Sequence, residues 1–575
     1  MSNNISISPQ RQTLIVYIVL TIVTLAVFWQ VNQFDFINFD DNVYVTQNSH
    51  IHSGLTPEGV RWAFSTQYLG LWNPLVWLSF MFDYQIYGFN AGGYHLTNRV
   101  LHLLSTLLLF WLFNRMTGAV WKSAFVAAIF AFHPLHVESV AWISERKDVL
   151  SAFFWMLTLC LYVYYTEKPV IIRYLLVLFS FVCALMSKPM VVTLPVIMII
   201  LDYWPLERFQ SKKGKLILWQ LKEKIPFFIL SAALVIITLH SPQNTALRTL
   251  YNIFGQPKEF PLFSRIANAL VSYVTYLEKT FWPHDMAIFY PFPSQIPVWQ
   301  VIGASLLILI ITTAVIVMIK RLPYLFTGWL WYAITIVPVI GIIQISITAP
   351  YAMADRYHYL PSIGLAVMMA WGIPTLIKSE EIRKKLLFPA GIIFLAIISF
   401  LSWNQCGYWK NDIILFSHTL KVTDYNWLAY NNRGVAYNSL GNYKQAIEDY
   451  GRAIEIKPFY ANAYNNRSVA YNSLGSYRQA IEDCDRAIAI KPGYAEAYIN
   501  RGAAYKGLRN YGQAIEDLNR AIEIKPSYYA EAYIIRGVVY LGQGDNISGC
   551  RDARNACKLG NCKLLEATNT RGLCR

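Results

Sequence analysis

Two adjacent carboxylates, Asp40 and Asp41, follow the first apolar stretch of the chain. They stand where a membrane segment meets water, and a carboxylate held there is suited to act as a general base. The competing interpretation is a solvated loop, because acidic side chains behind a membrane segment are usually exposed. We hypothesise that one of the two acids is the base and that other parts of the chain bring a substrate to it.

A second group of polar side chains lies in residues 133–138, HPLHVE. His133, His136 and Glu138 have a spacing that suits a divalent metal ion, although no further ligand is identifiable and the proline interrupts the helix. A second interpretation is that these side chains contact the hydroxyl groups of a sugar. In the third, they only satisfy one another's hydrogen bonds at a helix end.

Four cations stand next to the ends of apolar stretches: Arg146, Lys147, Lys188 and Arg356. Cations at that depth can hold a phosphate group through charge-assisted hydrogen bonds. The alternative is that each one only extends its charged end to the lipid headgroups. Their recurrence in three separate segments favours one shared anionic substrate.

The composition indicates a polytopic membrane protein for most of the chain. Of its 575 residues, 55% are hydrophobic and only 14% are charged, unlike an ordinary soluble protein. The formal net charge of +15 does not indicate nucleic-acid binding, because many of the basic residues lie in short loops between apolar stretches. We therefore expect membrane lipids, and no nucleic acid, as partners of this region.

Apolar stretches predict about eleven transmembrane helices. The first is expected to be a signal anchor, because it is longer than the apolar part of a signal peptide and no small-residue cleavage site follows it. The predicted spans are Thr13–Val31, Leu96–Phe113, Trp121–Phe132, Val149–Tyr165, Ile171–Met186, Val191–Trp204, Pro226–Leu239, Val298–Ile319, Leu325–Ile347, Tyr359–Ile377 and Leu386–Trp403.

The basic residues of the loops set the orientation, because such residues concentrate on the cytoplasmic side. With the N-terminus inside, three basic loops are cytoplasmic: the one with Arg115 and Lys122, the one with Lys168 and Arg173, and the cluster in residues 208–224. The later basic groups, at residues 320–321 and 378–385, stay inside only if Phe263–Trp282 lies along the surface or re-enters the membrane. The region after Trp403 is then outside, and the acids, histidines and cations all converge on the outer face.

A repeat of 34 residues begins near Trp427, with prolines at Pro458, Pro492 and Pro526 and with tyrosines and alanines at the same spacing. This pattern of small and aromatic residues predicts tetratricopeptide repeats, in which two antiparallel helices pack together. A fourth, altered copy follows, with one residue inserted near residues 528–529.

Asn432, Asn466 and Asn500 occupy the same position of successive repeats, on the expected concave face. Such a ladder of amides can hydrogen-bond the backbone of an extended peptide. The alternative is that the asparagines stabilise the repeats themselves.

The predicted fold is all-α. It has a polytopic membrane domain in residues 1–403, a linker in residues 404–426, and about four repeats with a cysteine-rich cap in residues 427–575. Four cysteines lie in the last 26 residues: Cys550, Cys557, Cys562 and Cys574. Disulfides are plausible if this end faces an oxidising compartment, but the pairing is not readable from the sequence.

Taken together, these motifs resemble the transmembrane and tetratricopeptide-repeat containing (TMTC) proteins, in a bacterial-like form. The resemblance is carried by Phe39–Asp41, His133–Trp142 with Arg146–Asp148, Ser187–Pro189, Asp355–Gly364 and the C-terminal repeats. TMTC proteins are similar to GT-C glycosyltransferases, which take a sugar from a polyprenyl-phosphate carrier and use an acid in the first outer loop. They are associated with O-mannosylation of serine or threonine in extracellular protein domains.

The resemblance implies an inverting transfer of a sugar, with mannose expected, to an extracytoplasmic protein. Asp40 or Asp41 would remove the proton from the acceptor hydroxyl as it attacks the anomeric carbon, and we prefer Asp40. The four cations would stabilise the leaving lipid phosphate. A divalent metal ion as cofactor stays open. The resemblance also implies a bacterial inner membrane, and the basic loops predict a cytoplasmic N-terminus and extracytoplasmic repeats.

Two alternatives stay open. A transferase of the same class would modify a lipid or a cell-surface polysaccharide, with the repeats recruiting partners, or the chain is a non-catalytic membrane scaffold. Acids and cations that converge on one face favour an enzyme, because a scaffold needs none of them. A transporter is disfavoured, because the spans contain few charges and no clear pair of interrupted helices.

Overall fold

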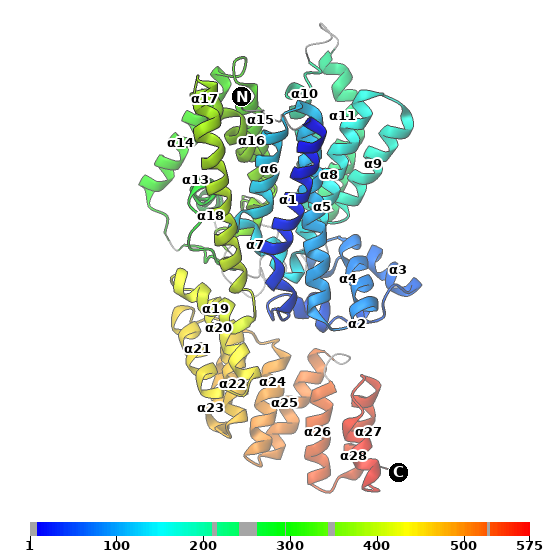
Figure 1. The fold of residues 1–575 in the computed structure, drawn as a ribbon. Coiled ribbons are helices and arrows are strands. Elements are labelled where there is room, and N and C mark those ends of the chain that lie inside the picture. Colours follow the sequence, from blue (N-terminus) through cyan, green and yellow to red (C-terminus); the bar gives the residue numbers. More distant parts are fainter. Residues whose placement is uncertain are drawn as a thin grey trace. The chain divides into compact units, whose positions relative to one another are not determined.

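The structure, a computed structural model, describes residues 8–209, 216–240, 261–293, 295–342, 351–525 and 530–574. The described residues are mainly helical, with no strand among them and one isolated bridge between Pro291 and Tyr351 (Figure 1). The chain divides into two compact units, Met1–Val422 and Thr423–Arg575.

Five helices of the first unit are long and apolar enough to cross a membrane, counted over the described residues. They are α1 (Pro9–Val27), α5 (Ala91–Thr117), α8 (Arg146–Glu167, counted together with the preceding turn from Ile143), α14 (Val298–Val317) and α18 (Phe388–Gly407). Helices α6 (Val120–Phe132) and α7 (Val137–Ala141) form a sixth span if their bend of 54° is counted as one crossing. The chain is therefore a membrane protein, and the number of eleven spans stays a prediction.

The bend between α6 and α7 follows from the sequence. Pro134 has no backbone N–H to continue the helix, so α6 ends and the short 3-10 helix Pro134–His136 leads into α7. Helix α1 packs against α5, α6 and α18, and α5 packs against α8 (Figure 1). This packing brings the start of α8 and the chain after α1 to the same end of the bundle.

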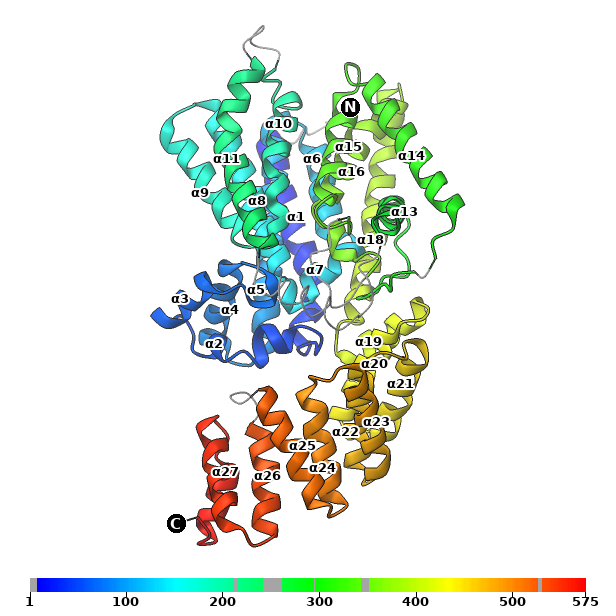
Figure 2. The same ribbon diagram turned by 180° about the vertical axis from the view of Figure 1, so that it is seen from behind.

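Helix α13 (Leu262–Phe281) corresponds to the segment for which we expect no crossing. It is not among the five long apolar helices. Figure 2 shows α13 end on and α14 lengthwise, so the two consecutive helices run in different directions. Its polar side chains donate to neighbouring backbone, Arg265 to the carbonyl of Ile342 at 3.0 Å and Asn268 to that of Ala352 at 2.8 Å.

The first long loop folds into α2 (Ser49–His52), α3 (Pro57–Ser65) and α4 (Pro74–Tyr87). Helix α3 begins as its sequence predicts, with a proline in its first turn and the Thr56 hydroxyl accepting from the N–H of Gly59 at 3.1 Å. Tyr44 stacks on Trp77 in a buried aromatic core at 5.0 Å between ring centres. This core fixes the chain that carries Asp40 and Asp41.

The remaining helices of the first unit are shorter or less apolar. They are α9 (Ile171–Leu185), α10 (Leu194–Tyr203), α11 (Leu216–Leu239), α15 (Pro323–Ile336), α16 (Ser362–Gly372), α17 (Glu380–Ile382) and α19 (Asp412–Val422). Short 3-10 helices carry several polar residues: Ile143–Glu145, Pro189–Thr193 and Asp355–His358.

The second unit consists of helix pairs. They are α20 (Trp427–Ser439) with α21 (Tyr443–Ile456), α22 (Ala461–Ser473) with α23 (Tyr477–Ile490), α24 (Ala495–Gly507) with α25 (Tyr511–Ile524), and α26 (Ala530–Gly542) with α27 (Asn546–Lys558), followed by α28 (Lys563–Thr570). Buried alanines such as Ala446 and Ala453 let the paired helices approach closely. The residue inserted near 528–529 lies outside the described residues.

Within each pair an arginine of the first helix donates two hydrogen bonds to an aspartate 16 residues later, as Arg433 does to Asp449 at 2.7 and 2.8 Å. The cap contains two disulfides, Cys550–Cys574 and Cys557–Cys562. Cross-links of this kind stabilise the altered repeat that contains them.

Candidate functional site

Asp41 is fully buried and acts as an anchor. One carboxylate oxygen accepts from the backbone N–H of Ile37 at 2.9 Å. The other accepts from the backbone N–H of Ser144 at 2.9 Å and from the Ser144 hydroxyl. Burial raises the pKa of Asp41 to about 7. The hydrogen bonds from Ser144 and Ile37 favour the ionised form and oppose this rise. Asp41 therefore ties the chain after α1 to the start of α8.

Asp40 is half-buried, and its carboxylate has no hydrogen-bond or ion-pair partner among the described residues. Burial raises the pKa of this carboxyl, whereas the charges of Lys147 and Arg356 oppose the rise. An unpaired carboxylate close to two cations is available to a substrate. Of the two predicted acids, Asp40 is thus the one whose oxygens are free to accept a proton.

Three of the four predicted cations converge on one buried carboxylate, Glu145. Its oxygens lie 3.0 Å from Nζ of Lys147, 3.2 Å from Nε of Arg356 and 3.8 Å from Nζ of Lys188. These cations come from α8, from the 3-10 helix Asp355–His358 and from the residue before the 3-10 helix Pro189–Thr193. The structure therefore gathers side chains that are far apart in the sequence, and we call Lys147, Lys188 and Arg356 the cation cluster.

Two further carboxylates orient the cation cluster. Lys188 is paired with Asp148, which also accepts from the Ser139 hydroxyl at 3.1 Å. Arg356 is paired with Glu138, and its backbone N–H donates to the same carboxylate at 2.9 Å. Glu138 is thus the partner of Arg356 and not of the histidines.

The side chains of the cation cluster are only 10–11% exposed. Aromatic rings pack against two of these cations. Lys147 lies over Tyr44 at 4.9 Å, and Arg356 lies over Trp142 at 5.5 Å. Low solvent exposure strengthens the attraction of these cations for an anion, because fewer water molecules screen their charge.

The structure places Arg146, the fourth predicted cation, elsewhere. Its guanidinium is completely buried and donates to Asp83 at 2.6 Å, to Asn98 at 2.5 Å and to the carbonyl of Tyr94 at 3.0 Å. These contacts join α4, α5 and α8. Arg146 therefore holds the scaffold of the site, and we leave it out of the cation cluster.

The two predicted histidines are buried and serve the packing. Nδ1 of His133 accepts from the N–H of Leu135 at 3.3 Å, so its Nε2 donates to the carbonyl of Thr280 at 3.0 Å. Nδ1 of His136 lies 2.7 Å from the carbonyl of Phe130. Within the described part of the chain no group of three or more histidine, cysteine or acidic residues has a geometry that holds a metal ion. The donor set of His133, His136 and Glu138 does not fit a metal ion, because Glu138 is paired with Arg356 and both histidines are bonded to backbone groups.

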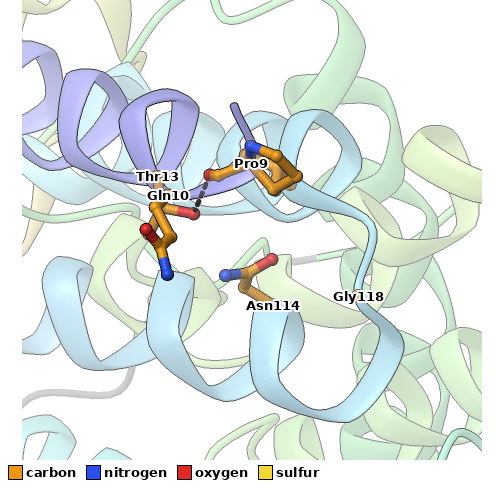
Figure 3. Close-up of a pocket in the computed structure, with 6 residues that line it drawn as sticks. Pro9, Gln10, Thr13, Asn114 and Gly118 are labelled. Atoms are coloured by element: carbon orange, nitrogen blue, oxygen red, sulfur yellow. Dashed lines mark hydrogen bonds between the residues drawn. The ribbon is translucent and has the colours of Figure 1, made fainter. Parts of the chain in front are cut away.

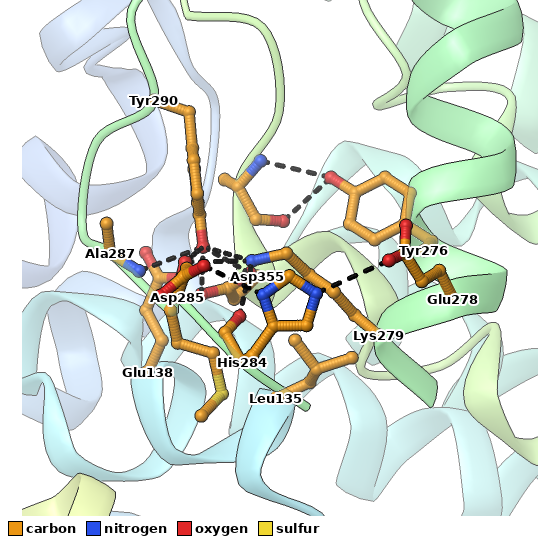
Figure 4. Close-up of polar contacts among 12 residues, drawn as sticks. Leu135, Glu138, Tyr276, Glu278, Lys279, His284, Asp285, Ala287, Tyr290 and Asp355 are labelled. Atoms are coloured by element: carbon orange, nitrogen blue, oxygen red, sulfur yellow. Dashed lines mark hydrogen bonds and ion pairs between the residues drawn. The ribbon is translucent and has the colours of Figure 1, made fainter. Parts of the chain in front are cut away.

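A hydrogen-bond network surrounds Asp355, the residue before Arg356 in the sequence (Figure 4). The hydroxyl of Tyr290 donates to the carboxylate of Asp355 at 2.8 Å. Nζ of Lys279 donates to that hydroxyl at 2.8 Å and lies 3.9 Å from Asp355. Because Asp355 precedes Arg356, this network holds the 3-10 helix from which the Arg356 guanidinium extends.

Sequence reasoning missed several of these residues as parts of the site: Asp83, Glu145, Asp148, Lys279 and Tyr290. The sequence did contain a signal for two of them. Glu145 and Asp148 flank Arg146 and Lys147 at the start of an apolar stretch. Four consecutive charged residues there need partners, since charged side chains at a membrane end are rarely left unpaired. Nothing in the sequence pairs Tyr290 with Asp355.

In the repeat unit, the predicted asparagines join neighbouring repeats. Nδ2 of Asn466 donates to Oδ1 of Asn431 at 3.1 Å, and Nδ2 of Asn500 donates to Oδ1 of Asn465 at 2.8 Å. Oδ1 of Asn432 accepts from its neighbour Asn431 at 3.2 Å. These contacts favour the stabilising role over the peptide-binding one.

A cavity of about 440 Å³ lies at the opposite end of α1, where that helix begins and α5 ends (Figure 3). It is lined by Pro9, Gln10, Thr13, Asn114, Gly118 and Val120. The Thr13 hydroxyl donates to the backbone carbonyl of Pro9 at 3.0 Å, so its hydrogen-bond partner belongs to the same helix. None of the predicted site residues lines this cavity, and it holds no charged side chain.

Comparison with known proteins shows matches in both units. The family model described as tetratricopeptide repeat matches residues 427–460 and 495–528, and a second described as TPR repeat matches residues 469–508. Protein O-mannosyl-transferase TMTC3 of Homo sapiens is 22% identical over 72% of this chain and 48% of that protein. Protein O-mannosyl-transferase F38B6.6 of Caenorhabditis elegans is 24% identical over 63% of this chain and 50% of that protein. The chain is homologous to TMTC-type proteins over much of its length.

Shorter matches have higher identity. Protein O-mannosyl-transferase Tmtc2 of Drosophila melanogaster is 38% identical over 90 residues, which are 16% of this chain and 10% of that protein. Among solved structures, the crystal structure of MamA is 27% identical, covers 26% of this chain and 86% of that chain, and has a TM-score of 0.24. The chain spans about half the length of F38B6.6 and of TMTC3.

Proposed function

We propose that the protein is a membrane glycosyltransferase that moves mannose from a polyprenyl-phosphate carrier to a serine or threonine hydroxyl of a protein outside the cytoplasm. The observation that supports this most is the unpaired Asp40 carboxylate next to the cation cluster. The relatives that are named protein O-mannosyl-transferases support the choice of sugar and acceptor.

In the proposed reaction the acceptor hydroxyl oxygen attacks the anomeric carbon from the side opposite the phosphate. A carbon–oxygen bond forms to the acceptor, and the bond between the anomeric carbon and the phosphate oxygen breaks, so the configuration inverts. The leaving polyprenyl phosphate keeps the electron pair of the broken bond. Asp40 takes the hydroxyl proton late, when bond formation has made that proton acidic, so a carboxylate of moderate basicity suffices.

The cation cluster stabilises the charge that develops on the leaving phosphate. Glu138, Glu145 and Asp148 hold the cations in place before the carrier arrives. A lysine ammonium and an arginine guanidinium have more N–H donors than these carboxylates occupy, so donors are left for the phosphate oxygens. The carboxylates thus set the geometry, and the carrier binds to a preformed arrangement.

We assign the repeats to the binding of the protein acceptor and place them outside the cytoplasm, in a bacterial inner membrane protein with a cytoplasmic N-terminus. The disulfides Cys550–Cys574 and Cys557–Cys562 support an oxidising compartment for the repeats. Because Asn466 and Asn500 join neighbouring repeats, acceptor binding falls to other side chains of the repeat surface.

The test is a transfer assay on membranes that contain the wild-type chain or an Asp40→Asn variant of equal abundance. Polyprenyl-phosphate mannose labelled in the sugar is supplied in one arm and nucleotide-linked mannose in the other. We expect label in protein, released by alkaline elimination, from the polyprenyl donor and only with the wild-type chain. Label in lipid or polysaccharide would indicate the alternative acceptor class. No transfer from any carrier sugar would favour the non-catalytic scaffold.

A further inference from the structure

The turn that carries Asp40 is held on two sides. On one side Asp41 joins it to Ser144, which is adjacent to Glu145 of the site. On the other side it lies against the junction of α18 and α19, which is more than 360 residues away in the sequence. Asp40 itself lies between these two attachments and has no hydrogen bond to its carboxylate among the described residues.

Two hydrogen bonds and an aromatic contact make the attachment to the α18–α19 junction. The backbone N–H of Asn38 donates to Oδ1 of Asp412 at 2.8 Å. The backbone N–H of Asp35 donates to the carbonyl of Lys410 at 3.1 Å. The ring of Phe39 lies 6.3 Å from that of Phe416, with the edge of one ring directed at the face of the other.

Asp412 is the one side chain of this attachment that makes a charge-assisted hydrogen bond. The Lys410 contact uses only backbone and does not depend on residue type. The bond from Asn38 to a carboxylate is stronger than a neutral one, and it acts two residues before Asp40. Asp412 is the first residue of α19, so its position is fixed by a helix and not by a loose loop.

We infer that Asp412 is a positioning residue: by holding the N–H of Asn38 it fixes the turn from which the Asp40 carboxylate reaches the acceptor hydroxyl. The catalytic consequence rests on the proposed function, whereas the contact itself does not. Asp412 touches neither substrate nor reacting atoms. It acts by keeping Asp40 at the right distance from the cation cluster, since a displacement of about 1 Å is enough to slow a transfer step about a hundred-fold.

Hydrogen exchange of the full-length chain in lipid nanodiscs tests the contact. We compare the wild type with Asp412→Ala, with Asp412→Asn, and with Asp424→Ala as a control that removes an exposed acid. Asp412→Ala should raise the exchange rate of peptides covering residues 36–41 about ten-fold, because a hydrogen bond to a charged group is lost. Asp412→Asn keeps a carbonyl oxygen as acceptor but loses the charge, so its exchange should lie between those of the wild type and Asp412→Ala, whereas Asp424→Ala should match the wild type.

The kinetics of transfer test the positioning role. In Asp412→Ala we expect kcat to fall about ten-fold while KM for the polyprenyl carrier changes less than two-fold, because the cation cluster is intact. Asp412→Asn should recover most of kcat. If Asp412→Ala merely unfolded the protein, the amount of active protein would fall, but kcat and KM of the remaining folded protein would not change separately. Asp412→Asn would then not restore kcat.

The two proposals fail in different ways. No transfer by the wild-type chain, together with raised exchange in Asp412→Ala, would overturn the proposed function and support the Asp412 contact. Equal exchange in all four chains would overturn the inference about Asp412. Raised exchange with unchanged kcat would overturn the positioning role.

Discussion

The carboxylate of Asp41 accepts hydrogen bonds from both the backbone N–H and the hydroxyl of Ser144. This relationship separates the roles of two neighbouring acids. Asp41 joins the chain after α1 to the start of α8, whereas the carboxylate of Asp40 has no partner among the described residues.

Replacing Asp41 by alanine should destabilise the protein more than it changes the chemistry of the remaining folded fraction. The N–H groups of Ile37 and Ser144 would lose their acceptor in a buried place. We expect the free energy of unfolding to fall by about 2 kcal/mol, which is typical for buried donors left unpaired. Thermal unfolding in detergent measures it. An unchanged melting temperature would contradict the anchoring role.

Arg146→Leu should lower stability strongly, because the buried carboxylate of Asp83 would lose its partner. The expected cost is about 3–5 kcal/mol, the range for breaking a buried ion pair. The double variant Asp83→Leu/Arg146→Leu should recover part of the loss, since no uncompensated charge stays buried. Melting temperatures of the single and double variants measure this. If Arg146→Leu instead weakens carrier binding at full stability, Arg146 belongs to the cation cluster after all.

Lys188→Gln should raise KM for the polyprenyl carrier by about ten-fold and leave KM for the acceptor unchanged, because one charge that holds the phosphate is lost. The matched control is Lys421→Gln, which removes an exposed lysine from α19. Steady-state kinetics with each substrate varied in turn measure both constants. An equal rise of both KM values in Lys188→Gln would indicate a general loss of structure instead.

Transfer should require the ionised form of Asp40, and burial raises the pKa of this carboxyl above its ordinary value. Activity should therefore be low in acid and rise with pH through a midpoint above about 4, the ordinary aspartate value. Lys147 lowers the pKa of Asp40 and Glu145 raises it. The acid midpoint of kcat/KM should therefore move up in Lys147→Met and down in Glu145→Gln. Shifts in the same direction for both variants would argue against Asp40 as the titrating base.

The double variant Asn466→Ala/Asn500→Ala should loosen the repeats, because each side chain joins two neighbouring repeats through one hydrogen bond. We expect a loss of about 1 kcal/mol for each bond. Limited proteolysis of the full-length chain, with Gln445→Ala as an exposed control, follows the opening of the repeats. A loss of acceptor binding at unchanged protease resistance would restore the peptide-binding interpretation.

Much of the fold was predictable because its signals are local. Each of these signals lies within a short stretch of sequence. Examples are the proline that ends α6, the capped start of α3 and the regular spacing of the prolines in the repeats. Tetratricopeptide repeats are confirmed, as is the all-α class. The number of eleven spans stays a prediction, because apolar helices such as α9 and α10 match the hydropathy pattern but are shorter than a typical membrane span.

The site was predictable as a set of residue types but not as a set of contacts. Lys147, Lys188 and Arg356 were selected because cations next to membrane ends suit a phosphate, and the structure brings these three together. Arg146 carries the same charge and adjoins Lys147, yet its side chain leaves α8 towards Asp83. Which way a side chain leaves a helix depends on partners distant in the sequence, and charge patterns do not contain that information.

The central claim is that Asp40 is the base and Asp41 the anchor. We would measure transfer of labelled mannose from polyprenyl-phosphate mannose by membranes with the wild-type chain, Asp40→Asn and Asp41→Asn, each normalised to folded protein. Asp40→Asn should lower transfer by roughly 10²–10⁴-fold at unchanged stability, the usual contribution of a general base. Asp41→Asn should keep most of the transfer per folded molecule. Full transfer by Asp40→Asn, or loss of transfer only in Asp41→Asn, would contradict the account.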